Sequence, residues 1–102
     1  MGKLNVNKVI IVGTLERDPN IGLTKNDKKV ANLLVVTDES YTNNEKVTIE
    51  KYEKHKIVAW GRQAENCETF KKGDKVYIEG KNQTRRTESS VITEVVATLV
   101  QK

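Results

Sequence analysis

Aromatic and basic side chains share one face of the stretch that runs from Tyr52 to Trp60. Successive side chains of a β-strand point to opposite faces, so Tyr52, Lys54, Lys56, Val58 and Trp60 line up together. Aromatic rings can stack on nucleobases and lysines can meet phosphates, a combination that holds single-stranded nucleic acid. A half-buried strand with a solvated lysine face would show the same alternation. The stretch therefore favours nucleic-acid binding only together with other features of the chain.

The opposite face of this stretch narrows to Ile57 and Ala59, as a strand does when it enters a core. Trp60 is therefore expected outside the core. A single surface cation is more often solvated than bound, so the prediction depends on a set of residues. Lys25, Lys28 and Lys29 fit either a contact along the nucleic-acid path or a solvated turn. The candidate rings are Tyr41, Tyr52 and Trp60, and the candidate phosphate contacts are Lys8, Lys54, Lys56, Arg62, Arg85 and Arg86.

The residues needed for catalysis or metal binding are scarce. His55 is the only histidine and Cys67 the only cysteine, so a histidine cluster and an internal disulfide are excluded. His55 is expected to make a buried or interface hydrogen bond, and Cys67 to pack in a core. The sequence holds no glycine-rich phosphate cradle and no carboxylates at metal-site spacing. We therefore expect no catalytic residue, no metal, no cofactor and no enzymatic activity.

The 102 residues suit one domain, spanning residues 1–102, and no composition shift marks a boundary. A net charge of +4 weakly favours a polyanionic partner. No apolar run is long enough to cross a membrane, and no secretion signal is present. The lone cysteine fits a reducing compartment, so a cytoplasmic location is expected.

The order of predicted elements indicates an all-β fold. Val, Ile and Thr-rich segments predict strands at residues 7–15, 30–37, 48–60, 76–79 and 91–100. A helix is predicted at residues 63–72 and ends before Gly73. Turns are predicted at residues 17–20 and 25–28, a polar loop at residues 38–46 and a hairpin connection at residues 84–90. Gly13 and Gly80 are expected at bulges or bends. Five strands with one short helix between the third and fourth are the order of a five-stranded Greek-key OB-fold barrel, which commonly binds oligonucleotides across strands two and three.

Motifs in the same order resemble bacterial-type single-stranded DNA-binding proteins (SSB) over nearly the whole chain. The matching segments are residues 6–13 (VNKVIIVG), 18–19 (DP), 30–32 (VAN), 38–41 (DESY), 55–62 (HKIVAWGR), 72–80 (KGDKVYIEG), 84–85 (TR) and 93–96 (TEVV). The resemblance implies an OB-fold that forms a homo-oligomer, usually a tetramer, with a dimer also compatible. It also implies sequence-independent binding of single-stranded DNA in replication, recombination or repair.

Family stacking rings carry over only in part. Tyr41 stands where the family commonly has tryptophan, and Trp60 where it commonly has phenylalanine. Lys54 and Thr87 stand where tryptophans are usual, and the connection after Thr87 is shorter than in the family. We hypothesise that Tyr52 partly replaces the ring missing at position 54.

The family's flexible linker and acidic tail have no counterpart here, so tail-mediated recruitment of replication proteins is not supported. The alternative function, from another class, is an SSB-like accessory module that works mainly through protein–protein contacts, as in a primosome. An OB-fold nuclease is disfavoured by the lack of a metal-site cluster. A bacterial, phage, mobile-element or mature organellar source would each fit the sequence.

Overall fold

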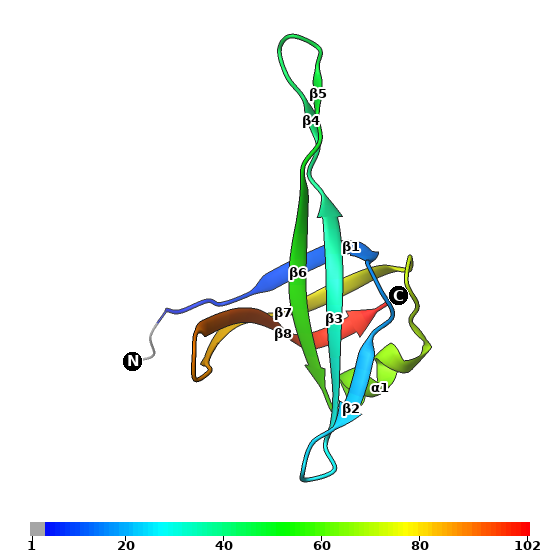
Figure 1. The fold of residues 1–102 in the computed structure, drawn as a ribbon, viewed down its shortest axis with the longest axis vertical. Coiled ribbons are helices and arrows are strands. Elements are labelled where there is room, and N and C mark those ends of the chain that lie inside the picture. The colour runs from blue at the N-terminus through cyan, green and yellow to red at the C-terminus, as the bar shows by residue number, and fades with distance from the viewer. Residues whose placement is uncertain (1–3) are drawn as a thin grey trace.

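The computed structural model describes residues 4–102, in which five long strands close into a barrel (Figure 1). The ring runs β1-β7-β8-β6-β3 and closes where β1 pairs again with β3. Four of these five pairings are antiparallel, and β6 with β8 is parallel. The five strands are β1 (Val9–Leu15), β3 (Lys29–Asp38), β6 (Tyr52–Trp60), β7 (Lys75–Arg86) and β8 (Val91–Gln101).

The core follows the period of two that the strands show. On the paired strands β3 and β6, Leu33 lies opposite Ile57 and Ala31 opposite Ala59, and all four are buried. Burial of each of the two larger side chains, Leu33 and Ile57, contributes about 1.5–3 kcal/mol relative to its exposed state. The alternate residues of both strands face outward, so one surface of this pair is left for function.

Two glycines allow the backbones of neighbouring strands to approach closely. A Cβ atom on Gly13 would lie 2.5 Å from the carbonyl oxygen of Val36, where β1 passes from β7 to β3. A Cβ atom on Gly80 would lie 2.3 Å from the carbonyl oxygen of Val96. The register of β7 against β8 shifts between Glu79 and Gly80, so the bend predicted at Gly80 is a β-bulge.

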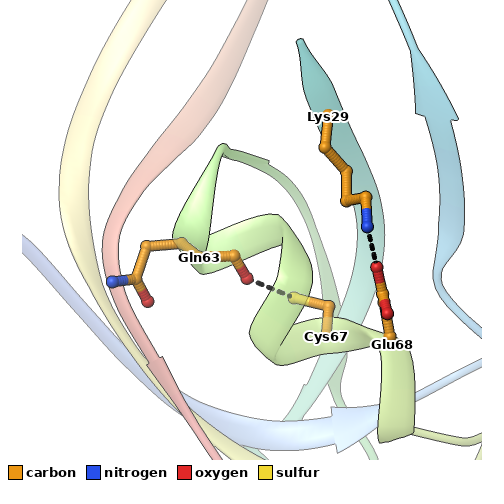
Figure 2. Close-up of polar contacts among 4 residues, drawn as sticks. All are labelled: Lys29, Gln63, Cys67 and Glu68. Carbon is orange, nitrogen blue, oxygen red and sulfur yellow. Dashed lines mark hydrogen bonds and ion pairs between the residues drawn. The ribbon is translucent and has the colours of Figure 1, made fainter. Parts of the chain in front are cut away.

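One end of the barrel is closed by the short helix α1 (Arg62–Asn66) and a 3₁₀ turn, η1 (Cys67–Thr69). Ala64, Cys67 and Phe70 are buried against the core. Figure 2 shows the Cys67 thiol donating to the carbonyl oxygen of Gln63 at 3.2 Å, and Glu68 forming an ion pair with Lys29 of β3. The 3₁₀ turn therefore contacts β3 through an ion pair, while the buried side chains of α1 and η1 fill the end of the barrel.

The predicted helix over residues 63–72 was too long: α1 ends at Asn66 and η1 at Thr69, because Phe70 has an extended backbone and turns the chain away. Gly73 is therefore not a helix cap. It has a positive φ of 92° in the turn before β7, and its N–H donates to the carbonyl oxygen of Leu15 at 2.9 Å. Within residues 4–102, no helix is long and apolar enough to cross a membrane.

Three short strands were not predicted. β2 (Asn20–Leu23) pairs antiparallel with β3, in a segment expected to follow a turn. β4 (Tyr41–Thr42) and β5 (Thr48–Ile49) form a hairpin in place of the expected polar loop, and it projects beyond β3 and β6 (Figure 1). The Asn43 side chain shapes its tip by accepting the backbone N–H groups of Glu45 and Val47 at 2.9 and 3.1 Å.

Candidate nucleic-acid interface

The outward face of β3 and β6 is set by their register. Trp60 lies opposite Val30, Val58 opposite Asn32, and Lys56 opposite Leu34. Directly opposed residues of an antiparallel pair share a face, so these six side chains form one surface. The pairs Val36 with Lys54 and Asp38 with Tyr52 continue it toward the β4–β5 hairpin. The face predicted for the stretch from Tyr52 to Trp60 is therefore the outer face of the barrel.

Two adjoining hollows of about 300 and 340 Å³ lie on this face. They share Asn32, Arg85 and Glu94, so together they form one continuous depression, called the groove from here on. Arg85 and Glu94 come from the β7–β8 hairpin, which forms one wall. The first hollow is also lined by Arg17, Asn20, Leu33, Lys56, Ile57 and Ile92, and the second by Val30, Val58 and Trp60.

The Trp60 indole lies outside the core, with 39% of the residue exposed. It lines the second hollow, beside apolar Val30 and Val58. The ammonium group of Lys28 lies 5.7 Å from the centre of the ring, within the range of a cation–π interaction. Lys28 does not line that hollow, so the indole contacts a cation while remaining accessible from the groove.

Three of the predicted phosphate contacts are paired with carboxylates. Lys54 lies 3.0 Å from Glu16, and Arg85 donates from Nε to Glu94 at 2.9 Å. Lys8 lies 3.7 Å from Glu79, and neither residue lines the groove. Lys56, Arg62 and Arg86 form no ion pair with any residue in the described part of the chain. Among the predicted cations, Lys56 is thus the unpaired one that lines the groove.

The predicted rings are spread along the outer surface. Tyr52 is 55% exposed at the start of β6, on the same face as Trp60. Tyr41 is 54% exposed in the hairpin that projects from the barrel. Arg62 is exposed at the first turn of α1, and Arg86 is exposed at the end of β7, next to Arg85. The structure therefore brings Lys56, Trp60 and Arg85 together in the groove and places the remaining predicted residues outside its lining.

His55 and Cys67 make structural contacts. The Nε2 atom of His55 lies 2.9 Å from the Thr37 hydroxyl, which in turn donates to Glu39 at 2.8 Å. Burial raises the pKa of the Cys67 thiol to about 11, which keeps it protonated at neutral pH. Among residues 4–102, no three His, Cys, Asp or Glu side chains are grouped in a way that could hold a metal ion.

Several groove residues were not found by sequence reasoning. Asn20 and Asn32 lie opposite each other on β2 and β3, and Glu94 reaches the groove from β8. The alternation in β3 gave a signal for Asn32, because it is a polar residue between buried Ala31 and Leu33. Glu94 gave no comparable signal, since its place in the groove depends on the parallel pairing of β6 with β8.

Comparison with known proteins identifies the family. The model of the single-strand binding protein family matches residues 6–102. This chain belongs to that family. Its sequence is 37% identical over 103 residues to Single-stranded DNA-binding protein 1 of Chlorobaculum tepidum. That alignment covers 94% of this chain and 64% of the relative, so the chain spans less than two thirds of the relative's length.

Solved structures of the SSB family have the same fold. The structure of an SSB from Plasmodium falciparum in complex with single-stranded DNA superposes with a TM-score of 0.83 at 25% identity. The match covers 99% of this chain and 96% of the Plasmodium chain. The wild-type single-stranded DNA-binding protein of Thermus aquaticus gives a TM-score of 0.83 at 24% identity, over 94% of this chain and 49% of its own. The predicted OB-fold, with its helix between the third and fourth barrel strands, is thereby confirmed.

Proposed function

We propose that this protein binds single-stranded DNA without a strict sequence requirement, in DNA replication, recombination or repair. The observation that carries the proposal is the groove, where an accessible indole, an unpaired lysine and an arginine converge on the outer face of β3 and β6. The relative from Chlorobaculum tepidum is named as a single-stranded DNA-binding protein, and the similar Plasmodium falciparum SSB was solved with single-stranded DNA. The SSB family supports a non-enzymatic role.

The binding mechanism has two physical parts. Lysines and arginines neutralise phosphates and release counterions, which supplies affinity that falls with salt concentration. Trp60 offers a flat surface on which an unstacked base can lie. The bases of duplex DNA are already stacked on one another, so they are not free to stack on the indole. The charged part therefore supplies attraction, and the aromatic part selects single strands over duplexes.

The proposal is tested by titrating the protein with dT oligomers and with duplexes of equal length over a series of salt concentrations. We expect tight, salt-dependent binding of the oligomers and weak binding of the duplexes. Equal affinity for both forms, or no binding of dT at low salt, would reject single-strand binding. The second result would favour the accessory-module alternative, which the pairing of Lys8, Lys54 and Arg85 with carboxylates also supports.

Lys56→Gln is expected to reduce the salt dependence of binding more than Lys54→Gln. Lys56 lines the groove without an ion pair among the described residues, whereas Glu16 holds Lys54 at 3.0 Å. Loss of one phosphate contact should make the slope of log K against log salt less steep by about 0.7. The control is Lys75→Gln on β7, which removes the same charge outside the groove lining. Identical slopes for Lys56→Gln and the control would contradict the contact.

Tyr52→Ala is expected to weaken binding by about 10-fold, as follows from the loss of one stacked base. The ring is exposed on the same face as Trp60 and Lys54, so a strand leaving the groove along β6 would pass it. Equilibrium titration with dT oligomers long enough to reach Tyr52 measures the effect. Tyr52→Phe keeps the ring and should bind like the parent. An unchanged affinity for Tyr52→Ala would reject the hypothesis that Tyr52 replaces the ring missing at position 54.

A homo-oligomer, expected to be a tetramer, is the second part of the proposal. Ile10 and Val12 of β1 are 54% and 53% exposed, and across the strand pair they face Glu79 and Tyr77. Desolvation and the nearby Glu79 carboxylate raise the pKa of Tyr77, so the phenol on this face stays uncharged at neutral pH. An exposed apolar face of this kind is typical of a contact between subunits. Measurement of the protein's mass in solution tests the assembly.

We also propose a cytoplasmic location for the protein.

A further inference from the structure

The turn between β2 and β3 holds a lysine in a defined place. The N–H of Thr24 donates to the carbonyl oxygen of Lys28 at 2.9 Å, and the N–H of Lys28 donates to the Thr24 hydroxyl at 3.2 Å. Asp27 has a positive φ of 59°, and its N–H donates to the carbonyl oxygen of Thr24 at 3.0 Å. Hydrogen bonds within residues 24–28 therefore fix the backbone that carries Lys28.

Strand pairing brings this turn next to the indole. The N–H of Gly61, the residue after Trp60, donates to the carbonyl oxygen of Lys29 at 2.9 Å. The Nζ atom of Lys28 lies over the Trp60 ring, 5.7 Å from its centre. Among the described residues Lys28 forms no ion pair, whereas the neighbouring Lys29 is paired with Glu68. The indole is thus the partner that the fold gives to the Lys28 ammonium group.

Lys28 lies outside the hollow that the indole lines. Trp60 lines the second hollow beside Val30 and Val58, and Lys28 is not part of that lining. A base that enters the groove can therefore stack on the indole without displacing the ammonium group. Each base carries its own sugar and phosphate, so a strand that places a base on the ring also brings phosphates to the edge of the ring.

We propose that Lys28 is a positioning residue for Trp60: its ammonium group covers one face of the indole, leaves the other face for a single base, and neutralises a phosphate beside that base. The inference rests on the proposed binding of single-stranded DNA and adds a residue to that site. It also gives the strand a path, which leaves the groove over the β2–β3 turn.

A lysine that is only solvated makes a different prediction. Its loss would lower the net charge by one and weaken binding as the loss of any other lysine in the turn would. Lys25 is the matched comparison, because it is exposed in the same turn and contacts no aromatic ring in the part of the chain that the structure describes. The difference between Lys28→Met and Lys25→Met therefore separates the ring contact from the net charge.

The test titrates each variant with dT oligomers over a series of salt concentrations. Lys28→Met should make the slope of log K against log salt less steep by about 0.7 and weaken binding about 5-fold at 0.1 M salt, as expected for one lost phosphate contact. Lys28→Arg keeps the cation and should bind like the parent, and Lys25→Met should change the slope less. Equal slopes for the two Met variants would overturn the proposal, whereas a parent that does not bind dT would reject the proposed function itself.

The dependence on the ring is tested by a double-mutant cycle. If the indole holds the ammonium group in place, Lys28→Met should weaken binding less in a Trp60→Ala protein than in the parent. Losses that simply add would show that Lys28 acts without the ring and would overturn its positioning role.

A further measurement needs no DNA, so it stands even if the proposed function fails. Trp60 is the only tryptophan, and iodide quenches its fluorescence more strongly where a cation raises the local concentration of anions. Neutral acrylamide reports the accessibility of the ring alone. The ratio of iodide to acrylamide quenching should fall about 2-fold in Lys28→Met at low salt and stay at the parent value in Lys28→Arg and Lys25→Met. An unchanged ratio in Lys28→Met would overturn the contact with the indole, and with it the proposal.

Discussion

Trp60→Ala is expected to weaken the binding of single-stranded DNA by about 10- to 100-fold, the largest effect of any single side chain in the groove. The indole is exposed beside an apolar floor of Val30 and Val58, so a base that stacks on it also removes apolar surface from water. Equilibrium titration with dT oligomers at constant salt measures the loss. Binding should weaken without a change in salt slope, because no charge is removed.

The control for this prediction keeps a ring at position 60. Trp60→Phe should retain most of the affinity, since phenylalanine also offers a flat face. Because Trp60 is the only tryptophan, the intrinsic tryptophan fluorescence of the parent reports on this one site. Stacking should quench it on addition of DNA. Unquenched fluorescence at saturation, or full affinity of Trp60→Ala, would show that bases do not stack on the indole.

Gly80→Ala is expected to reduce the free energy of unfolding by about 3 kcal/mol, because overpacking a closely packed site forces the backbone to move. The added Cβ would lie 2.3 Å from the carbonyl oxygen of Val96, and a backbone atom cannot turn away as a flexible side chain can. The bulge in β7 would have to open, which disturbs the pairing with β8. Chemical denaturation at one fixed protein concentration measures the change.

Gly22→Ala is the matched control for this prediction. Gly22 also lies in a strand, β2, but a Cβ atom there would have no neighbour within 4 Å. The same chemical change should therefore leave the stability nearly unchanged or raise it slightly, because alanine restricts the unfolded chain. Equal losses for the two variants would show that the close approach of Gly80 to Val96 does not limit the fold.

The barrel was predictable because its information is local. The alternation from Tyr52 to Trp60 assigned both faces of β6, and the order of strands with one helix indicated the architecture. The short strands were missed for the opposite reason. β4 and β5 have two residues each, and their hairpin depends on the side chain of Asn43 accepting backbone N–H groups, which propensity does not report.

The candidate site could be predicted only in part. The residues of one strand, such as Lys56 and Trp60, can be placed together from their spacing alone. Glu94 cannot, because it reaches them through a parallel pairing of strands far apart in the sequence. The ion pair of Lys54 with Glu16 is equally invisible to spacing, and it gives that lysine a carboxylate partner with which a phosphate would have to compete.

The closure of the barrel has a consequence for its motions. β1 and β3 are joined through two residue pairs, Thr14 with Val36 and Leu15 with Val35, and β6 and β8 are also joined through two, whereas β7 and β8 are joined through ten. Local opening costs least where the fewest contacts must break, so the ring should open first at these two seams. The amide hydrogens there would exchange with solvent before those between β7 and β8, and opening of the β6–β8 seam would widen the groove that both strands line.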